Sequence, residues 1–374
     1  MVRRPATAIV LVSIAGTIAA AAACGAAHDR EVHAASTVYV RTDTDDTTIV
    51  SPGVTASGKP SENTTLTAGY TIDAWSGASV DVVSAATGTI TERRHEGQVG
   101  VGFDDGTTRY DGRYRLSYEH DYQSHGFVVG ASRDLARHNT TVSANLLGSF
   151  DTAGRAGDPH FAQALYTYGA RLGLSQTLDP LTMIDLSLDA TVLDGYQASP
   201  YRWVAVGGDG TCAAAAPFCV IEQVPDLRVR GAASARLRHA LGDHGSFGLD
   251  YRFYLDSWGV QSHTIEPTLT WLPSDTSALA LHVRYYTQGE ATFYRPRYFD
   301  FMDGGGYLTR DRKLSAFYDN EVGAAYDRTW ELDDGERQLE VALRASLSRL
   351  TYLAYVGLEH VNALEMTSLV GLTF

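Results

Sequence analysis

The sequence predicts an all-β protein: a closed antiparallel up-and-down transmembrane β-barrel of about sixteen strands, within a range of roughly 14 to 18. Three observations predict this fold. Many segments alternate apolar and polar residues with a period of two, the chain begins with an apolar segment typical of an export signal, and it ends in an alternating segment whose last residue is Phe374.

The clearest alternating segment covers residues 108–122. One face carries Tyr110, Gly112, Tyr114, Leu116, Tyr118 and Tyr122, and the other carries Asp111, Arg113, Arg115, Ser117, Glu119 and Asp121. Successive side chains of a strand point to opposite faces, so this segment is predicted to separate an apolar from an aqueous medium.

Similar segments follow along the chain, and many are joined by short turn signals such as DDG at 104–106 and GDHG at 242–245. A soluble β-sandwich also alternates. The number, length and order of these segments favour a barrel, because about ten residues per strand match a tilted crossing of a bilayer. Closure is expected because an open sheet edge in lipid would leave backbone groups without hydrogen bonds.

Composition agrees with this fold class. The chain of 374 residues has 36 glycines and 21 tyrosines but only 4 methionines, which favours strands and turns over helices. Its formal net charge of −14 argues against a nucleic acid partner, because such partners require clustered Lys and Arg.

The N-terminus divides the chain into three expected parts. Residues 1–24 are predicted to be a signal peptide, either cleaved simply or of lipoprotein type with lipidation at Cys24. Residues 25–45 are expected to be a periplasmic N-terminal segment, and residues 46–374 the barrel. With sixteen strands and a periplasmic C-terminus, the four long connections at 76–91, 151–162, 197–225 and 289–312 would all fall on the periplasmic side, against the usual short-turn rule. Either one hairpin is miscounted or the barrel is unusual, and the sequence does not decide the sidedness. Phe374 is interpreted as an assembly signal of outer-membrane barrels.

Cys212 and Cys219 lie close together in an exported chain, and a disulfide is predicted between them. A metal site is the poorer interpretation, because neither has a neighbouring His or a third Cys.

The charged face of the strands is the candidate site. An arginine turned toward lipid would cost roughly 2 to 4 kcal/mol near the bilayer midplane, so this face is predicted to line the lumen. The predicted lumen and selectivity residues are Asp111, Arg113, Arg115, Glu119, Asp185, Asp189, Arg228, Arg230, Arg236, Arg238, Asp250, Arg252, Asp256, Arg284 and Arg344. Two uses stay open: a ladder that tunes the passage of a solute, or ion pairs and waters that fill a closed lumen.

No catalytic role is predicted, because the chain has no GxSxG, no HExxH and no phosphate-binding glycine loop. No metal and no cofactor are predicted. Around the hairpin DSWGVQSHTIE, Trp258 is expected to be an interfacial anchor, and Asp256 and His263 are expected to face each other.

Blocks such as TTIVSPGV, YTIDAWSGASVDVVSAAT, ITERRHEGQVGVGF and LDYRFYLDSWGVQSHTIEPTLTWLP lie between Thr47 and Pro296. They resemble the bacterial family called domain of unknown function 3570. The resemblance implies an outer-membrane β-barrel of a Gram-negative bacterium with no catalytic residues to carry over. It also implies a connection to an envelope export or redox system and a periplasmic lipoprotein as partner.

The sequence therefore favours a porin-like channel that passes a small polar solute through a mixed-charge lumen. The alternative is a non-conducting barrel that serves as a scaffold or accessory protein. Outer-membrane lipid and the barrel-assembly machinery are the other expected partners.

Overall fold

The computed structural model describes residues 31–77, 90–208, 212 and 218–374. The predicted signal peptide, Cys24 and most of the connection at 76–91 lie outside these residues. Within them, no helix is both long enough and apolar enough to cross a membrane.

A closed antiparallel barrel of sixteen strands confirms the predicted fold class. The strands follow one another around the wall in chain order, and β9 pairs directly with β12. The barrel strands are β1 (Val32–Asp43), β2 (Thr47–Ser61), β3 (Thr64–Gly77), β4 (Ile90–Asp104), β5 (Thr108–Tyr118), β6 (Tyr122–Leu135), β7 (Thr140–Gly154), β8 (Ala162–Asp179), β9 (Thr182–Gly195), β12 (Leu227–Ala240), β13 (Gly245–Asp256), β14 (Gln261–Ser274), β15 (Ser277–Gln288), β16 (Phe317–Leu332), β17 (Arg337–Tyr352) and β18 (His360–Thr373). A separate hairpin consists of β10 (Trp203–Val206) and β11 (Phe218–Ile221).

The barrel begins earlier than the sequence predicted. Val32–Asp43 is not a segment in front of the barrel but strand β1, which pairs with β18 on one side and β2 on the other. Phe374 and Val32 exchange backbone hydrogen bonds of 2.9 and 3.2 Å at this junction. The expected boundary at residue 46 is wrong: Asp45 and Asp46 lie in the turn between β1 and β2, so residue 46 falls inside the barrel and not at its start.

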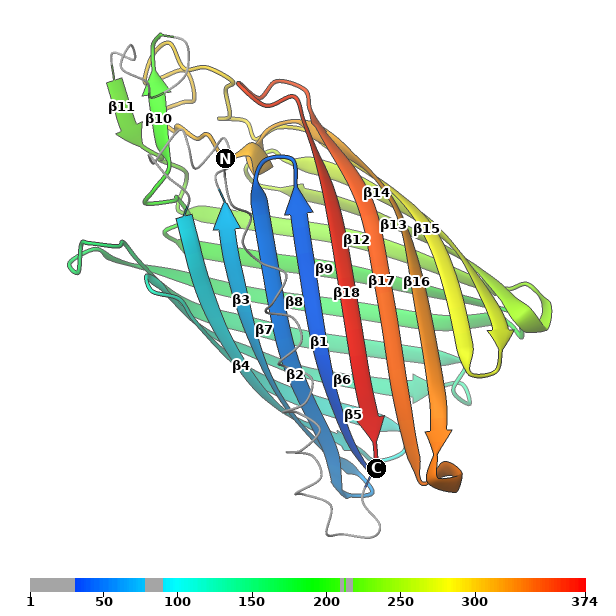
Figure 1. Ribbon diagram of the computed structural model, residues 1–374. Coiled ribbons are helices and arrows are strands. Elements are labelled where there is room, and N and C mark those ends of the chain that lie inside the picture. Colours follow the sequence, from blue (N-terminus) through cyan, green and yellow to red (C-terminus); the bar gives the residue numbers. More distant parts are fainter. Residues whose placement is uncertain (1–30, 78–89, 209–211, 213–217) are drawn as a thin grey trace, which may run out of the picture.

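The start of β1 and the end of β18 lie at the same end of the wall, because the described barrel has an even number of strands. Figure 1 shows the C-terminus at the bottom and the β10–β11 hairpin above the opposite end. Short turns such as those at 62–63 and 180–181 lie at the same end of the barrel as the C-terminus. The described parts of the long connections lie at the opposite end, so the inference that sixteen strands place them on the side of the C-terminus was wrong. Three strands, β16 to β18, follow the connection 289–316. An odd number of strands places this connection at the end of the barrel opposite the C-terminus.

The outer face of the wall is apolar. On β9, Leu186 and Leu188 are 41% and 60% exposed, while the carboxylates of Asp185 and Asp189 lie on the opposite, inner face and bond to β8. The same alternation recurs in the other strands, so the hydrophobic residues that a soluble protein would bury are exposed here around the barrel.

Aromatic side chains gather on the outer face near both rims. Near the end of the long connections, three tyrosine hydroxyls lie 2.7–2.8 Å from Nδ1 of a histidine on the next strand: Tyr70 with His95, Tyr114 with His125, and Tyr251 with His263. Near the other end the outer face carries Phe103, Tyr110, Trp271 and Trp330. Such pairs of girdles are typical of barrels held at both surfaces of a bilayer.

Candidate functional site

The inner wall of the barrel is charged and open to solvent. Arginine side chains that point inward from four different strands keep about half of their surface accessible: 45% for Arg115, 57% for Arg171, 63% for Arg236 and 54% for Arg344. Side chains in a filled interior would be buried. The lumen at these positions therefore has room for water beside the arginines.

Most of these inward arginines face a carboxylate on the same or an adjacent strand. The pairs are Arg41 with Glu365, Arg94 with Asp73, Arg115 with Glu96 (3.5 Å), Arg171 with Asp189 (2.5 Å), Arg228 with Asp256 (2.5 Å), Arg236 (3.6 Å) and Arg238 with Asp250, Arg284 with Glu321 (3.4 Å) and Asp319 (3.7 Å), and Arg344 with Asp327 (3.2 Å). Apart from the buried pair of Arg228 and Asp256, these ion pairs are partly exposed to solvent and are worth about 0 to 1 kcal/mol each, so they order the side chains more than they stabilise the barrel.

The structure brings together only some of the predicted residues. Arg228, Arg236, Arg238, Asp250 and Asp256 meet on the adjacent strands β12 and β13. Asp185 accepts a hydrogen bond from the hydroxyl of Ser175 instead of pairing with a cation. Asp111 and Arg113 lie on the inner face of β5, and no ion pair joins either of them to another described residue.

Several carboxylates of the inner wall were missed by the sequence. Glu96, Asp319, Glu321, Asp327 and Glu365 all accept contacts from inward arginines. Alternation in β4, β16 and β18 marks their face, but only the strand register shows which arginine each one meets.

A cavity of about 500 Å³ lies against the inner wall where β1 to β5 approach the end with the long connections. It is lined by Tyr39, Ile49, Ser51, Asp73, Trp75, Glu92, Arg94 and Glu119. Glu119 is the only predicted lumen residue in this lining, and it lies in the turn that follows β5. Burial raises the pKa of the Glu119 carboxyl, and Arg94 offsets part of that rise.

The long connections pack against each other at this end of the barrel. The β10–β11 hairpin lies beside the connection 289–316, with bridges from Val206 to Tyr298 and from Gln223 to Leu308. Their shared centre is Glu222, whose side chain is 1% exposed. Its carboxylate accepts hydrogen bonds from the Arg202 guanidinium at 2.9 and 3.1 Å.

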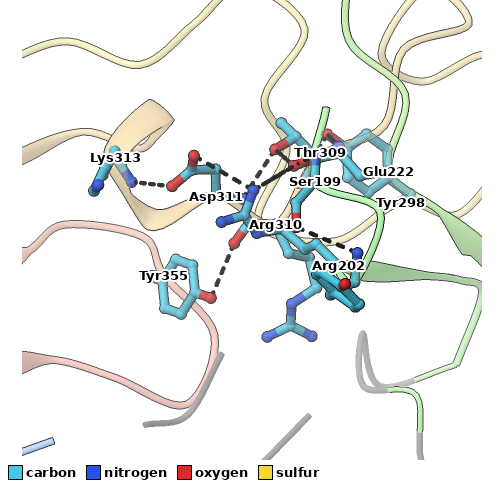
Figure 2. Close-up of polar contacts among 10 residues, drawn as sticks. Ser199, Arg202, Glu222, Tyr298, Thr309, Arg310, Asp311, Lys313 and Tyr355 are labelled. Atoms are coloured by element: carbon cyan, nitrogen blue, oxygen red, sulfur yellow. Dashed lines mark hydrogen bonds and ion pairs between the residues drawn. The ribbon is translucent and has the colours of Figure 1, made fainter. Parts of the chain in front are cut away.

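Two further donors complete the environment of Glu222, as Figure 2 shows. They are the backbone N–H of Ser199 at 2.7 Å and the hydroxyl of Thr309 at 2.5 Å. Arg202 also lies 3.4 Å from Asp311 of the second connection. Burial raises the pKa of the Glu222 carboxyl, and Arg202 and Thr309 offset part of the rise.

Two contacts tie this group of connections to the turns beside it. The hydroxyl of Tyr201 donates to Asp121 in the turn between β5 and β6. Burial and this hydrogen bond raise the pKa of Tyr201 to about 12. On the other side, Arg312 Nη1 donates to Asp45 Oδ2 at 2.6 Å in the turn between β1 and β2. The connections therefore reach along much of the rim of the barrel.

A disulfide between Cys212 and Cys219 confirms the predicted bridge; the Cα atoms are 5.8 Å apart. It joins Cys219 in β11 to Cys212, which lies between β10 and β11 in the sequence.

Two expectations for the hairpin DSWGVQSHTIE were wrong. Trp258 is not an interfacial anchor: it is 4% exposed, packs on Phe293 at 5.3 Å between ring centroids, and lies 4.2 Å from the Arg228 guanidinium. Asp256 and His263 do not face each other either. Asp256 points inward to Arg228 while His263 points outward to Tyr251, because the two residues fall on opposite faces of adjacent strands.

No group of three or more His, Cys, Asp or Glu side chains in the described part of the chain is arranged to hold a metal ion. The residues around the cavity and the arginine wall are suited to binding charged or hydrogen-bonding solutes.

A family model described as "Protein of unknown function (DUF3570)" matches residues 155–344. No curated protein matches the sequence. Among solved structures, a bacterial polysaccharide outer membrane secretin is similar at 9% identity with a TM-score of 0.49, covering 91% of this chain and 97% of that one. The outer membrane protein OprD from Pseudomonas aeruginosa is similar at 8% identity with a TM-score of 0.47, covering 93% and 94%. CdiB from Acinetobacter baumannii is similar at 10% identity with a TM-score of 0.46, covering 90% and 60%.

Proposed function

Because this chain belongs to the DUF3570 family of proteins of unknown function, we propose its function from the geometry of its own residues: it is an outer-membrane channel of a Gram-negative bacterium that passes a small polar solute. The observation that carries this proposal is the half-exposed state of inward arginines such as Arg171 and Arg236. Charged side chains of both signs around a wet lumen favour polar solutes over apolar ones.

The location in the outer membrane is part of the proposal. The apolar outer face supports it, since exposing that face to water would be unfavourable and lipid would cover it. Short turns at the end where β1 begins and β18 ends, and long connections at the other end, agree with the orientation usual for such barrels, in which the short turns face the periplasm. Outer-membrane lipid, the barrel-assembly machinery and a periplasmic lipoprotein are the partners proposed with it.

The lumen residues predicted from the sequence are proposed to tune passage. Those among them that form ion pairs keep charges of both signs at the wall, where a passing solute exchanges contacts with them in turn. We propose no catalytic role and no cofactor for them.

A second candidate is a non-conducting barrel that serves as a scaffold. The packed connections around Glu222 favour it. Contacts to Asp121 on one side and to Asp45 on the other hold these connections as a folded surface at the rim, where a partner protein can bind.

Ion conductance in a planar bilayer separates the two candidates. The purified, refolded mature chain is expected to give stepwise currents. A matched pair of variants on β17 sharpens the test: Ser346→Trp adds a bulky ring on the inner face, beside Glu365, whereas Ala345→Trp adds the same ring on the outer face. The first should lower the current per channel and the second should leave it unchanged. Absence of current from the folded wild-type barrel would support the scaffold and reject the channel.

A further inference from the structure

Arg230 is a cation on the inner wall without a counter-ion. It lies on β12, next to Arg228 on the same face. Its Nε atom is buried, and no described residue accepts a hydrogen bond from it. No carboxylate of the described chain lies within ion-pair distance of its guanidinium, although other arginines of this strand each have one.

The carboxylate opposite Arg230 is already occupied. Asp256 is the register partner of Arg230 on β13. Its Oδ2 accepts from Nε of Arg228 at 2.9 Å and from the hydroxyl of Tyr254 at 2.7 Å, and its Oδ1 accepts from the backbone N–H groups of Trp258 and Val260 at 2.9 and 3.0 Å. Its side chain is 0% exposed. Asp256 therefore neutralises Arg228 and has no free position for a second guanidinium.

A second unpaired arginine lies nearby on the adjacent strand. Arg252 points inward from β13, is exposed, and has its guanidinium 6.0 Å from the ring of Tyr254. In the register, Tyr254 is opposite Ala232 and Arg252 is opposite Ser234. Tyr254 therefore lies between the two arginines: Arg252 is two residues away on β13, and Arg230 is diagonal to Tyr254 on β12. Only small side chains separate the two levels on β12.

The second inward carboxylate on β12 and β13 serves other arginines. Asp250 contacts both Arg236 at 3.6 Å and Arg238, further along the strands. Five inward arginines of β12 and β13 thus face two carboxylates of these strands, and Arg230 and Arg252 are the two that no ion pair joins to a described carboxylate.

We propose that Arg230 and Arg252 form a subsite in the lumen for an oxyanion, either a carboxylate or a phosphate group of the passing solute. This inference rests on the proposed channel function and names the class of solute. A guanidinium donates two parallel N–H bonds to such a group, and partial removal from water strengthens these bonds. Arg230 is only partly exposed and its Nε is buried without an acceptor, so an oxyanion that reaches it supplies the hydrogen bonds and the negative charge that the described residues do not.

The first test is binding to the folded barrel in detergent, which needs no channel activity. Inorganic phosphate and acetate are titrated separately, with binding followed by 31P line broadening for phosphate and by calorimetry for both. Arg230→Gln and Arg252→Gln are each expected to weaken binding by about tenfold, because each removes charged donors worth about 1.5 kcal/mol. Arg349→Gln removes the same charge from the outer face of β17 and should leave binding unchanged.

The second test is block of the current. Phosphate or acetate added to a chloride solution should reduce the wild-type current, and the double variant Arg230→Gln/Arg252→Gln should need a higher concentration for the same block. Block by phosphate alone identifies a phosphate-bearing solute, and block by both identifies a general oxyanion site. Equal binding and equal block in wild type and double variant would overturn the subsite. Binding lost in the variants of a barrel that carries no current would reject the channel and keep the subsite.

Discussion

Leu188 and Asp189 are neighbours in β9 that face opposite media. Leu188 is 60% exposed on the outer face, whereas Asp189 lies 2.5 Å from Nε of Arg171 on the inner face. A pleated strand in a closed wall produces this relationship, because each step of one residue changes the side of the wall.

Leu188→Arg is expected to prevent assembly of the barrel. It places a cation in lipid at a cost of roughly 2 to 4 kcal/mol near the midplane. Ser187→Arg adds the same side chain one residue earlier, on the inner face, and should fold. Heat-modifiable mobility of the refolded proteins on gels measures the folded fraction, and equal folding of both variants would contradict the assigned facing.

Asp256→Asn is expected to destabilise the barrel by about 3 to 5 kcal/mol, because it leaves the buried guanidinium of Arg228 without its partner. Asp327→Asn makes the same change in the half-exposed pair with Arg344 and should cost about 0 to 1 kcal/mol. Urea unfolding in detergent, followed by tryptophan fluorescence, compares the two. Similar midpoints would show that Asp256 does not hold Arg228 in the way described.

Glu222 makes the packing of the connections depend on pH. Its folded-state pKa is raised by burial, so the folded form binds a proton more readily than the unfolded form. The contribution of Glu222 to the stability of the packed connections is therefore largest at acidic pH, below its unfolded-state pKa. This contribution is lost as the pH rises through the folded-state pKa.

Hydrogen exchange of the amides at 218–224 and 307–311 should consequently be slower at mildly acidic pH than at neutral pH, after correction for intrinsic exchange. Glu222→Gln cannot ionise and should remove this difference. Glu119→Gln in the turn after β5 serves as control, because it lies outside these two segments. A pH dependence that persists in Glu222→Gln would assign it to another group.

Reduction of the bridge between Cys212 and Cys219 should loosen the hairpin and spare the barrel, because β10 and β11 form a sheet of their own. Gel mobility should change on reduction, while the urea midpoint of the barrel should not. The paired variant Cys212→Ser/Cys219→Ser should behave like the reduced protein. Free thiols in the purified mature protein would contradict the bridge.

The sequence predicted the wall well because alternation is a local property. Residues such as Leu188 and Asp189 reveal their faces through their neighbours alone, and sixteen strands were expected and found. β1 was missed because its outer face begins with the small residues Ala34 and Ser36, so its alternation is less clear than that of the other strands.

The ion pairs and the packed connections could not be predicted in the same way. Glu222 and Thr309 are 87 residues apart, and Arg312 and Asp45 are 267 apart. Contacts of this kind depend on the closed wall to bring distant segments together. Trp258 was misjudged for the same reason, since Phe293, which covers it, belongs to another connection.

The seam between β1 and β18 sets the order in which this protein can mature. Phe374 and Val32 bond across it, so the wall cannot close until β18 has been synthesised. Before closure the sheet has two open edges and a large exposed apolar surface, and contacts between residues this far apart in the sequence form slowly. A chain that has not yet formed β18 must therefore be kept from aggregating until the wall closes.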